Sequence, residues 1–426
     1  MPASICLVSP GNLASNPRLI KEADALHDAG YRVTAIACNY TEALEPYDDE
    51  IARRVGWTAI RVPRPAGERV TGAAARLAAR VMDAVGLDIP VSVAAVAYGG
   101  PFSALRSAAL QQRADLYVAH YVAGLPAAAA AAARHGALLG FDAEDFHSGE
   151  GQEGDAEDFR MELVKRIEES ALPSCRHFTA ASPLIARAYG ALYGVTPTTV
   201  LNVFPLSMAP ASPGPALPPT ATPPAGGGLR AYWFSQTIGL DRGLQSFIAA
   251  MALTRTRVTL DIRGCNRWGH GETLLAMARD LGIGDRVSIL PMEAPERMVT
   301  LAAGYDLGLS LETDATQSRR LCLTNKIFTY LLAGIPVLMS DTPAQSELAP
   351  QLGAAGLLGS LGDPRTMSHA LDSLGDPAAL AAAKAAAWRL GRERYNWDHE
   401  KKTLLESVAA ALGTRPDLTV GGEGRP

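Results

Sequence analysis

The chain has 426 residues, 48% of them hydrophobic and 19% charged, so it can form two or three domains that each bury an apolar core. Its formal net charge of -5 argues against a nucleic-acid-binding protein, because such proteins carry a basic excess. The five cysteines are scattered and include no Cys-x-x-Cys pair, which argues against a zinc site or a disulfide framework and fits a reducing compartment.

The first half of the chain alternates strand-like and helix-like segments. Short apolar runs predict strands at residues 4–9, 32–38, 115–120, 137–142, 177–181 and 198–202. The first helix has Pro17 at its start and apolar residues at helical spacing, and Gly30 ends it. This alternation is typical of a parallel sheet with right-handed crossover connections.

Composition changes at residues 208–228, which are almost entirely proline, alanine and glycine and predict an interdomain linker. Alternation then resumes, with strands predicted at residues 230–235, 257–263, 286–290, 306–311 and 335–340. The predicted fold class is therefore α/β, with two Rossmann-like doubly wound domains, 1–207 and 229–393, that face a ligand cleft. Residues 413–426 are polar and glycine-rich, and we expect a disordered tail there.

The stretch from Thr324 to Asp341 is the most informative one in the second half. Asn325 and Lys326 open a short predicted helix that Gly334 ends, and a buried strand follows. A lysine at a helix N-terminus, beside the carboxyl ends of parallel strands, can hold phosphate oxygens.

A second cationic position follows the first strand of this half. Ser235 ends that strand, and Gln236 begins the polar turn after it. Asp241 can cap a helix in which Arg242 takes the first position. An arginine beside the positive end of a helix can bind a diphosphate, although an exposed arginine next to a helix cap has the same pattern.

These two segments resemble the donor domain of family 4 glycosyltransferases, whose sequence around the lysine is close to NKLFEYLAAGLPVI. The resemblance implies the B-type glycosyltransferase fold and assigns Arg242 and Lys326 to the donor diphosphate. It also places Ser235, Gln236 and Asn325 in the donor site.

The sequence departs from the family at two glutamates that contact the sugar and the ribose. Leu321 and Thr329 stand where those glutamates are expected, and the Thr329 hydroxyl can bind a ribose more weakly than a carboxylate can. Glu312, at the carboxyl end of the strand 306–311, is the candidate that replaces the missing catalytic carboxylate. A solvated loop carboxylate is the alternative.

The first half resembles the acceptor domain of the same family through NPRLIKEADALHDAGYRVTAIA, which follows the first strand. Gly11 and Asn12 form the turn after that strand, and Arg18 lies near the start of the next helix. His120 ends the strand 115–120, where the family often has a histidine near the transferred sugar. A strand-end histidine bonded to backbone is the alternative.

The segment from Phe141 to His147, FDAEDFH, resembles the YDSHEL strand end of the family. Glu144 stands at the family's histidine and Asp145 at its glutamate, so a carboxylate here could orient or deprotonate an acceptor hydroxyl. The same acids could instead form a solvated turn. Asn202, in LNVFP, matches the family's NVP before the interdomain crossing.

The resemblance implies transfer of a sugar from a nucleotide-diphosphate donor to a glycan or lipid-linked acceptor hydroxyl, with retention at the anomeric carbon. It implies synthesis of a polysaccharide or glycoconjugate, no metal and no cofactor besides the donor. The family ends in a tryptophan-led helix that packs back on the first domain, and residues 394–412 resemble it. A nucleotide-sugar 2-epimerase of the same fold and a non-catalytic nucleotide-sugar-binding partner remain as alternatives.

Residues 51–80 are rich in arginine, with Glu68 as an isolated acid, and residues 71–85 have apolar residues at helical spacing. A basic amphipathic helix can lie on an anionic membrane surface, and the alternative is a helix packed on the acceptor domain with its arginines in water. The apolar run 125–133 is far shorter than the roughly 20 residues that span a bilayer. We therefore expect a cytoplasmic protein, with the inner face of the membrane as its contact if residues 51–85 bind lipid.

Overall fold

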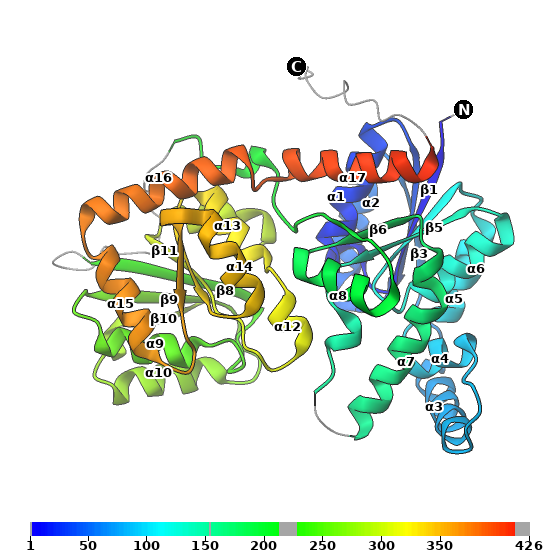
Figure 1. Cartoon of the computed structure of the whole chain (residues 1–426), viewed down its shortest axis with the longest axis horizontal. Helices are drawn as coiled ribbons and strands as arrows, with labels where there is room; N and C mark the ends of the chain where they lie inside the picture. Colours follow the sequence, from blue (N-terminus) through cyan, green and yellow to red (C-terminus); the bar gives the residue numbers. More distant parts are fainter. Residues whose placement is uncertain (1, 153–154, 213–227, 414–426) are drawn as a thin grey trace. The chain divides into compact units, whose positions relative to one another are not determined.

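The computed structural model describes residues 2–152, 155–212 and 228–413, and the chain divides into two compact units (Figure 1). One unit contains Met1–Val200 together with Lys401–Pro426, and the other contains Leu201–Glu400. Most of the predicted linker, residues 213–227, and nearly all of the predicted tail, residues 414–426, lie outside the described residues.

The first unit is built on a seven-stranded sheet in the order β3-β2-β1-β4-β5-β6-β7, in which neighbouring strands are parallel. Its strands are β1 (Ser4–Ser9), β2 (Arg32–Asn39), β3 (Thr58–Pro63), β4 (Leu116–His120), β5 (Leu138–Ala143), β6 (His177–Ala180) and β7 (Thr198–Thr199). Its helices are α1 (Pro17–Asp28), α2 (Glu45–Arg54), α3 (Glu68–Ala84), α4 (Val91–Tyr98), α5 (Phe102–Gln111), α6 (Leu125–His135), α7 (Asp155–Ala171), α8 (Pro183–Tyr193) and most of α17 (Trp397–Leu412).

The second unit repeats this plan with a six-stranded parallel sheet in the order β10-β9-β8-β11-β12-β13. Its strands are β8 (Leu229–Thr237), β9 (Val258–Cys265), β10 (Val287–Leu290), β11 (Leu307–Ser310), β12 (Val337–Ser340) and β13 (Gly356–Gly359). Its helices are α9 (Leu244–Leu253), α10 (His270–Asp280), α11 (Met298–Ala302), α12 (Gln317–Leu321), α13 (Asn325–Ala333), α14 (Pro343–Leu352), α15 (Pro364–Leu374) and α16 (Pro377–Glu393). The two sheets confirm the predicted α/β class with two Rossmann-like halves.

The strand order fixes where ligands can bind in each unit. In both sheets the order reverses between the first strand and the fourth, which are β1 and β4 in one unit and β8 and β11 in the other. Helices leave these strands toward opposite faces, so the loops after the two strands separate at the carboxyl edge. Polar residues in these loops can therefore meet a ligand.

Three strand predictions differ from the structure. β3 and β13 were not predicted, because each is a sheet edge without the long apolar run that marks a central strand. The strand predicted at residues 198–202 is limited to β7, because its neighbour β6 already ends at Ala180.

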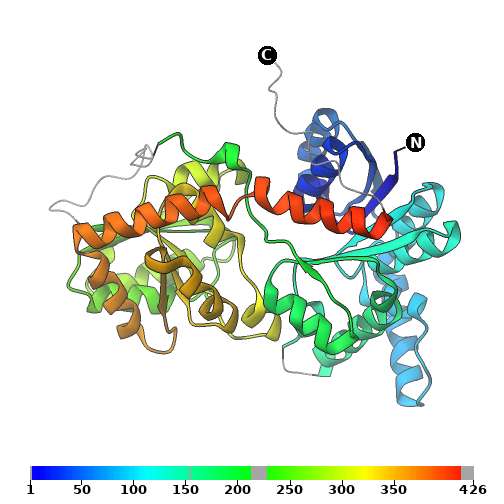
Figure 2. The ribbon, with the colours of Figure 1, turned by 45° about the horizontal axis from the view of Figure 1, so that its top comes forward.

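The helix α17 contributes to the core of the first unit. Val408 is fully buried and belongs to the same apolar cluster as Leu7 and Val118. Ser407 Oγ lies 2.9 Å from Nδ1 of His177 on β6. Figure 2 shows α17, in red, beside the strands of this unit.

Helix α13 packs closely on β11 because residue 308 has no side chain. A Cβ atom built on Gly308 would lie 2.1 Å from the ring of Tyr330. The Tyr330 hydroxyl lies 3.1 Å from the Tyr232 carbonyl on β8 and 3.3 Å from the Leu309 carbonyl on β11. The helix that carries Lys326 is thereby fixed against both central strands.

We expect Gly308→Ala to lower the free energy of unfolding by about 1–3 kcal/mol, because the added methyl group must displace a buried ring. Gly362→Ala is the matched control, since a Cβ atom there would lie 3.9 Å from Ser360 Oγ. Urea denaturation measures both changes. A Gly308→Ala protein as stable as the control would contradict this close packing.

Candidate functional site

The second unit places three cationic side chains around one buried carboxylate, Glu312. Glu312 follows β11, which lies beside β8 where the strand order reverses. Arg242 comes from the loop after β8, Arg319 from α12 and Lys326 from the first turn of α13. The group therefore lies at the carboxyl edge of the sheet, where α/β folds bind ligands.

Glu312 is 2% exposed, and each of its carboxylate oxygens faces a cation. Oε1 lies 3.3 Å from Lys326 Nζ, and Oε2 accepts a hydrogen bond from Arg319 Nη1 at 2.9 Å and lies 3.7 Å from Arg242 Nη1. The backbone is fixed to the end of β12, because the Glu312 N–H donates to Ser340 Oγ at 2.9 Å and its carbonyl accepts from it at 2.6 Å.

These contacts keep Glu312 ionised. Burial raises the pKa of its carboxyl, but the charges of Lys326, Arg242 and Arg319 outweigh burial, so the pKa lies below the ordinary glutamate value. The ion pairs of Glu312 therefore stabilise the fold at pH values above the ordinary glutamate pKa. This stabilisation is lost as the pH falls through the lowered pKa of Glu312.

The cluster keeps a surplus of positive charge. A second carboxylate, Asp241, lies 3.7 Å from Arg242 and 3.4 Å from Arg319, and its side chain is 59% exposed. Two carboxylates thus face three cations. An anionic group such as a phosphate would complete the balance.

Arg319 was not predicted from the sequence. It lies in α12, a short helix between the two segments that carry the resemblance, and Thr316 caps this helix by accepting a hydrogen bond from the Arg319 N–H at 3.2 Å. The signal that could have found it is the basic pair Arg319 and Arg320, shortly before the segment from Thr324 to Asp341. Of this pair, Arg319 faces Glu312, whereas Arg320 is exposed.

The start of helix α9 was predicted incorrectly. Asp241 was expected to cap a helix that begins at Arg242, but α9 begins only after its N-cap, Gly243. Gly243 has a φ of 66°, and a Cβ atom there would lie 2.9 Å from Leu311. This tight turn leaves Arg242 in the loop, where its guanidinium reaches Glu312.

The remaining predicted donor-site residues lie at the same edge. Ser235 and Gln236 are at the end of β8, where its pairing with β9 shifts register, and Gln236 is exposed. Asn325 is the first residue of α13. Thr329 is buried, and its hydroxyl donates to the Asn325 carbonyl at 2.9 Å. In this conformation the hydroxyl is therefore bonded within helix α13.

Arg18 is the centre of a buried ion-pair network in the first unit. Its Nε and Nη2 donate to the two oxygens of Asp142 at 2.7 and 2.8 Å, and its Nη1 donates to the Val200 carbonyl at 2.8 Å. Thr179 Oγ1 donates to the same carboxylate at 2.5 Å. Arg18 is 1% exposed, so in this structure it binds protein groups and not solvent.

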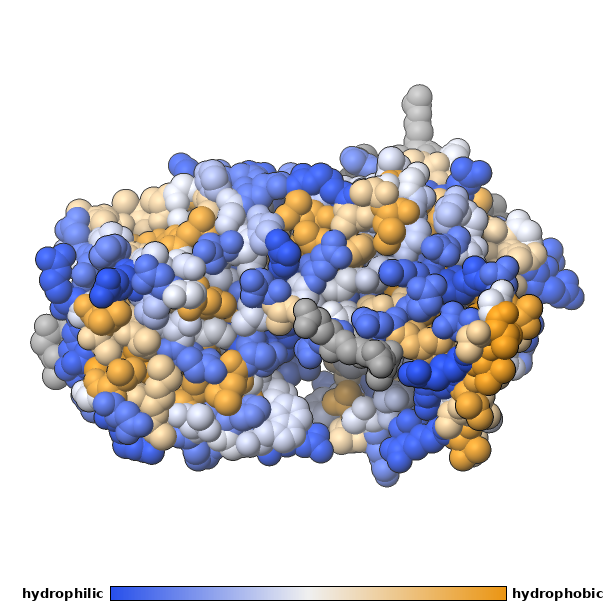
Figure 3. Space-filling view, turned by 60° about the horizontal axis from the view of Figure 1, so that its bottom comes forward, coloured by the Kyte–Doolittle hydropathy of each residue, from blue (hydrophilic) through white to orange (hydrophobic). Residues whose placement is uncertain are grey.

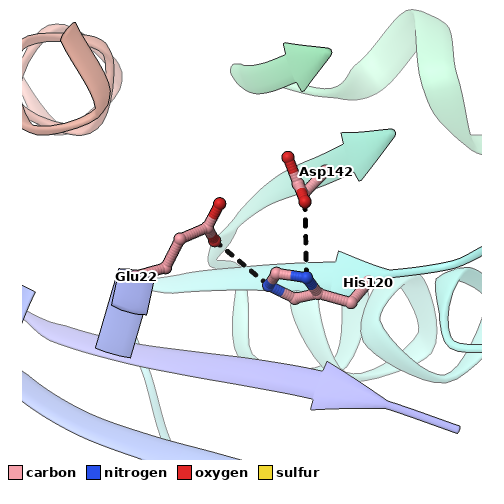
Figure 4. Close-up of side chains that lie close together, drawn as sticks. All are labelled: Glu22, His120 and Asp142. Carbon is pink, nitrogen blue, oxygen red and sulfur yellow. Dashed lines mark ion pairs between the residues drawn. The ribbon is translucent and has the colours of Figure 1, made fainter. Parts of the chain in front are cut away.

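His120 lies inside this network (Figure 4). Its Nε2 is 3.1 Å from Glu22 on α1, and its Nδ1 is 3.4 Å from Asp142 on β5. Burial lowers the pKa of the imidazole, but the carboxylates of Glu22 and Asp142 raise it more, so the pKa lies above the ordinary histidine value. The side chain is fully buried, and its predicted catalytic role stays a prediction.

Glu22, His120 and Asp142 offer ligand atoms within 4.8 Å of one another, a spacing that could hold a metal ion. Arg18 already donates to both oxygens of Asp142. A metal ion would face this guanidinium at close range, which electrostatic repulsion disfavours, and its binding would require a neutral His120. These residues fit an ion-pair network better than a metal centre.

Glu144 follows β5 and is half-buried, and its Oε1 has no hydrogen-bond partner among the described residues. Burial and the charge of Asp142 raise the pKa of this carboxyl to about 7. Burial and the charge of Arg18 lower the pKa of the Lys21 amine to about 7. Both groups can change protonation near neutral pH, as a group that takes a proton from a hydroxyl must.

Two further residues mark this edge of the first sheet. Tyr121, directly after β4, has a φ of 59°, a conformation that is uncommon for a bulky residue and clusters at functional sites. Asp145, the other predicted acid of this unit, is half-buried, and its carbonyl accepts a hydrogen bond from the Tyr189 hydroxyl at 3.4 Å.

Gly11 and Asn12 organise the turn after β1. The Asn12 amide donates to Asp48 Oδ2 at 2.8 Å, and its Oδ1 accepts from the Thr41 N–H at 2.7 Å. Both ends of this buried amide are thus used by the fold. Asn202 is half-buried and lies in the second unit, and the acceptor-side roles of these residues stay predictions.

We expect Asp142→Asn to destabilise the first unit by about 3–5 kcal/mol, because it removes the carboxylate closest to the buried Arg18 charge and leaves the more distant Glu22 at 3.7 Å. The pKa of Asp142 is lowered from 3.8 to about 2, so the stabilisation is present above the ordinary value and is lost as the pH falls toward 2. Urea denaturation between pH 7 and pH 3 measures it. Asp115→Asn, an exposed aspartate just before β4, is the control; an equal cost for both variants would contradict the network.

Comparisons with known proteins find glycosyltransferases that are similar to parts of this chain. Residues 16–206 match the family model described as "Glycosyl transferase 4-like domain". The chain is 33% identical over 144 residues to the D-inositol 3-phosphate glycosyltransferase of Nocardia farcinica, and 31% identical over 141 residues to that of Rhodococcus opacus. Each match covers 33% of this chain, which spans 30% of the length of these relatives.

Solved structures resemble nearly the whole chain. Anabaena HepE in complex with UDP and glucose has a TM-score of 0.67 at 14% identity, with 96% of this chain and 100% of that chain covered. TarM has a TM-score of 0.67 at 8% identity, with 97% and 99% covered. Likeness at such low identity shows the fold alone, which is the B-type glycosyltransferase fold.

Proposed function

We propose that this chain is a family 4-like glycosyltransferase, which transfers a sugar from a nucleotide-diphosphate donor to an acceptor hydroxyl. The observation that carries the proposal is the surplus positive charge of Arg242, Arg319 and Lys326 at the carboxyl edge of the second sheet. HepE was solved with UDP and with UDP-glucose, which supports a nucleotide-sugar donor.

The leaving group explains why the site is cationic. As the bond to the anomeric carbon breaks, negative charge develops on the departing diphosphate. Arg242, Arg319 and Lys326, together with the N-terminus of α13, would stabilise that charge. Side-chain cations can do this without a divalent ion, so the proposed reaction needs no metal and no cofactor. Retention at the anomeric carbon is proposed from the family resemblance.

The acceptor side is proposed for the first unit. Glu144, whose pKa is about 7, would orient or deprotonate the acceptor hydroxyl, with Asp145 beside it. The proposed acceptor is a glycan or a lipid-linked sugar, and the proposed product is a polysaccharide or glycoconjugate. The relatives named above act on an inositol phosphate by name, but they share only a part of their length with this chain.

A second candidate is a non-catalytic protein that binds a nucleotide sugar, and Thr329 favours it. This residue stands where the family has a glutamate, and its hydroxyl is buried and bonded within the helix. Proton NMR spectroscopy of nucleotide sugars incubated with and without acceptor distinguishes the candidates, because it resolves epimers of equal mass. A transferase releases nucleoside diphosphate with acceptor, a 2-epimerase alters the donor alone, and a binding protein changes neither.

Arg242→Ala and Lys326→Ala should each weaken the binding of a nucleoside diphosphate by about 1.5–3 kcal/mol, since each removes a charge-assisted contact. Isothermal titration calorimetry measures the loss. Arg257→Ala is the control, because Arg257 pairs with the exposed Asp285 at 3.1 Å in the same unit. Unchanged affinity in both test variants, with the fold retained, rules out the diphosphate site.

The membrane contact predicted for residues 51–85 would be made mainly by an apolar face of helix α3. Helix α3 leaves Val70, Leu77 and Val81 exposed along one face, and the hydrophobic strip at the right-hand edge of Figure 3 lies where Figure 1 places this helix. Several arginines are held by the protein: Arg61 by Asp49, Arg64 by Glu68, Arg76 by the Ala97 carbonyl and Arg80 by the Phe159 ring. Contact would therefore depend on the apolar face more than on charge. No helix in the described part of the chain has the length and apolarity needed to cross a bilayer.

We propose that this apolar face rests on the inner, anionic face of the cytoplasmic membrane, with Arg69 beside it. Wild-type protein should float with vesicles that contain anionic lipid, and a Leu77→Ser, Val81→Ser double variant should lose most of this binding. Leu253→Ser, an exposed leucine of the second unit, is the control. Absence of wild-type binding at low salt would leave α3 a scaffold element and favour a soluble acceptor.

A further inference from the structure

Glu312 presents its carboxylate to the three cations that the proposed function assigns to the donor diphosphate. Its oxygens lie 3.3 Å from Lys326, 2.9 Å from Arg319 and 3.7 Å from Arg242. A carboxylate and a phosphate present the same kind of oxygen pair to an arginine fork. The cations that the proposed function assigns to the donor diphosphate are thus already bound to a carboxylate of the protein.

The side chain and the backbone of Glu312 are held by different contacts. The backbone N–H and carbonyl of Glu312 are both bonded to Ser340 at the end of β12. In the described part of the chain, the carboxylate oxygens of Glu312 form ion pairs with the three cations. A competing anion can therefore release the side chain by replacing these ion pairs, while the strand end stays in place.

We propose that Glu312 is an internal counter-ion, which neutralises the donor site in the empty protein and turns away when a diphosphate binds. The ligand class rests on the proposed function. A diphosphate carries more negative charge than the carboxylate it replaces, so the exchange gains attraction from the same three cations. Glu312 would then set how tightly the site holds diphosphate, including the diphosphate that must leave after transfer.

The test uses inorganic pyrophosphate as the probe, because it contains the diphosphate without nucleotide or sugar. Glu312→Gln removes the competing charge and should bind pyrophosphate about tenfold more tightly than wild type at low salt, with the difference shrinking as salt rises. Glu312→Asp keeps the charge on a shorter side chain and should fall between the two. Calorimetry measures the affinities of the full chain.

The matched control is another buried carboxylate of the same strand. Asp306 lies just before β11 and pairs with Arg230 at 3.3 Å and with Lys384 at 2.6 Å. Asp306→Asn removes an equal charge from a paired aspartate at the opposite end of the strand, so it should leave pyrophosphate affinity unchanged. It therefore separates a site effect from a change of net charge or stability.

The pyrophosphate affinity of an Arg319 variant is a second, independent test. Arg319→Gln should weaken pyrophosphate binding about tenfold, because it removes the guanidinium that now donates to Glu312 at 2.9 Å. The neighbouring Arg320 is exposed, and Arg320→Gln should leave the affinity within about twofold of wild type.

The outcomes distinguish this inference from the proposed function. If Glu312 contacts the sugar instead, Glu312→Gln leaves pyrophosphate affinity unchanged and weakens only the whole donor, which overturns the counter-ion role. If wild type still transfers sugar while Glu312→Gln and Glu312→Asp bind pyrophosphate no more tightly, the inference alone is wrong. If none of the proteins binds pyrophosphate and wild type uses no nucleotide sugar, the proposed function is wrong and this inference with it.

Discussion

The second unit depends on an unequal balance of charge around one buried carboxylate. Glu312 cannot be buried unless it is paired, and it is paired with more positive charge than it neutralises. The surplus lies where the strand order reverses, so it faces the place where a sheet of this kind meets its ligand. The same ion pairs therefore stabilise this edge of the sheet and gather positive charge there.

The first unit also has ion pairs at the corresponding edge of its sheet, but there each basic side chain faces a carboxylate. Arg18 and His120 face the carboxylates of Glu22 and Asp142, and all four side chains are buried. This network joins α1 to β4 and β5 and has little charge to offer a ligand. The acid that can titrate, Glu144, lies beside it. The same topology thus supports a network of paired charges in one unit and a surplus of cationic side chains in the other.

Sequence patterns predicted the fold well because central parallel strands are buried on both faces and form continuous apolar runs. The position of Arg242 and Lys326 at the carboxyl edge of the sheet could also be predicted, because each stands in a local motif near a strand end; their role stays a prediction. Arg319 was not predicted: the basic pair Arg319 and Arg320 is a local signal, but which of the two faces Glu312 depends on the packing of α12, a tertiary contact. For His120 and Asn12 the sequence showed a polar residue at a strand end, but not that other buried polar groups face it.

Because residue 308 and Tyr330 approach so closely, a substitution at one of these positions limits which residues the other can have. A side chain at position 308 requires a smaller residue at 330, and a smaller residue at 330 leaves a void unless position 308 grows. Each change alone passes through a less stable protein, so gradual drift at either position is disfavoured. Because Tyr330 lies one helical turn from Lys326 on α13, this packing constraint also protects the position of the lysine across generations.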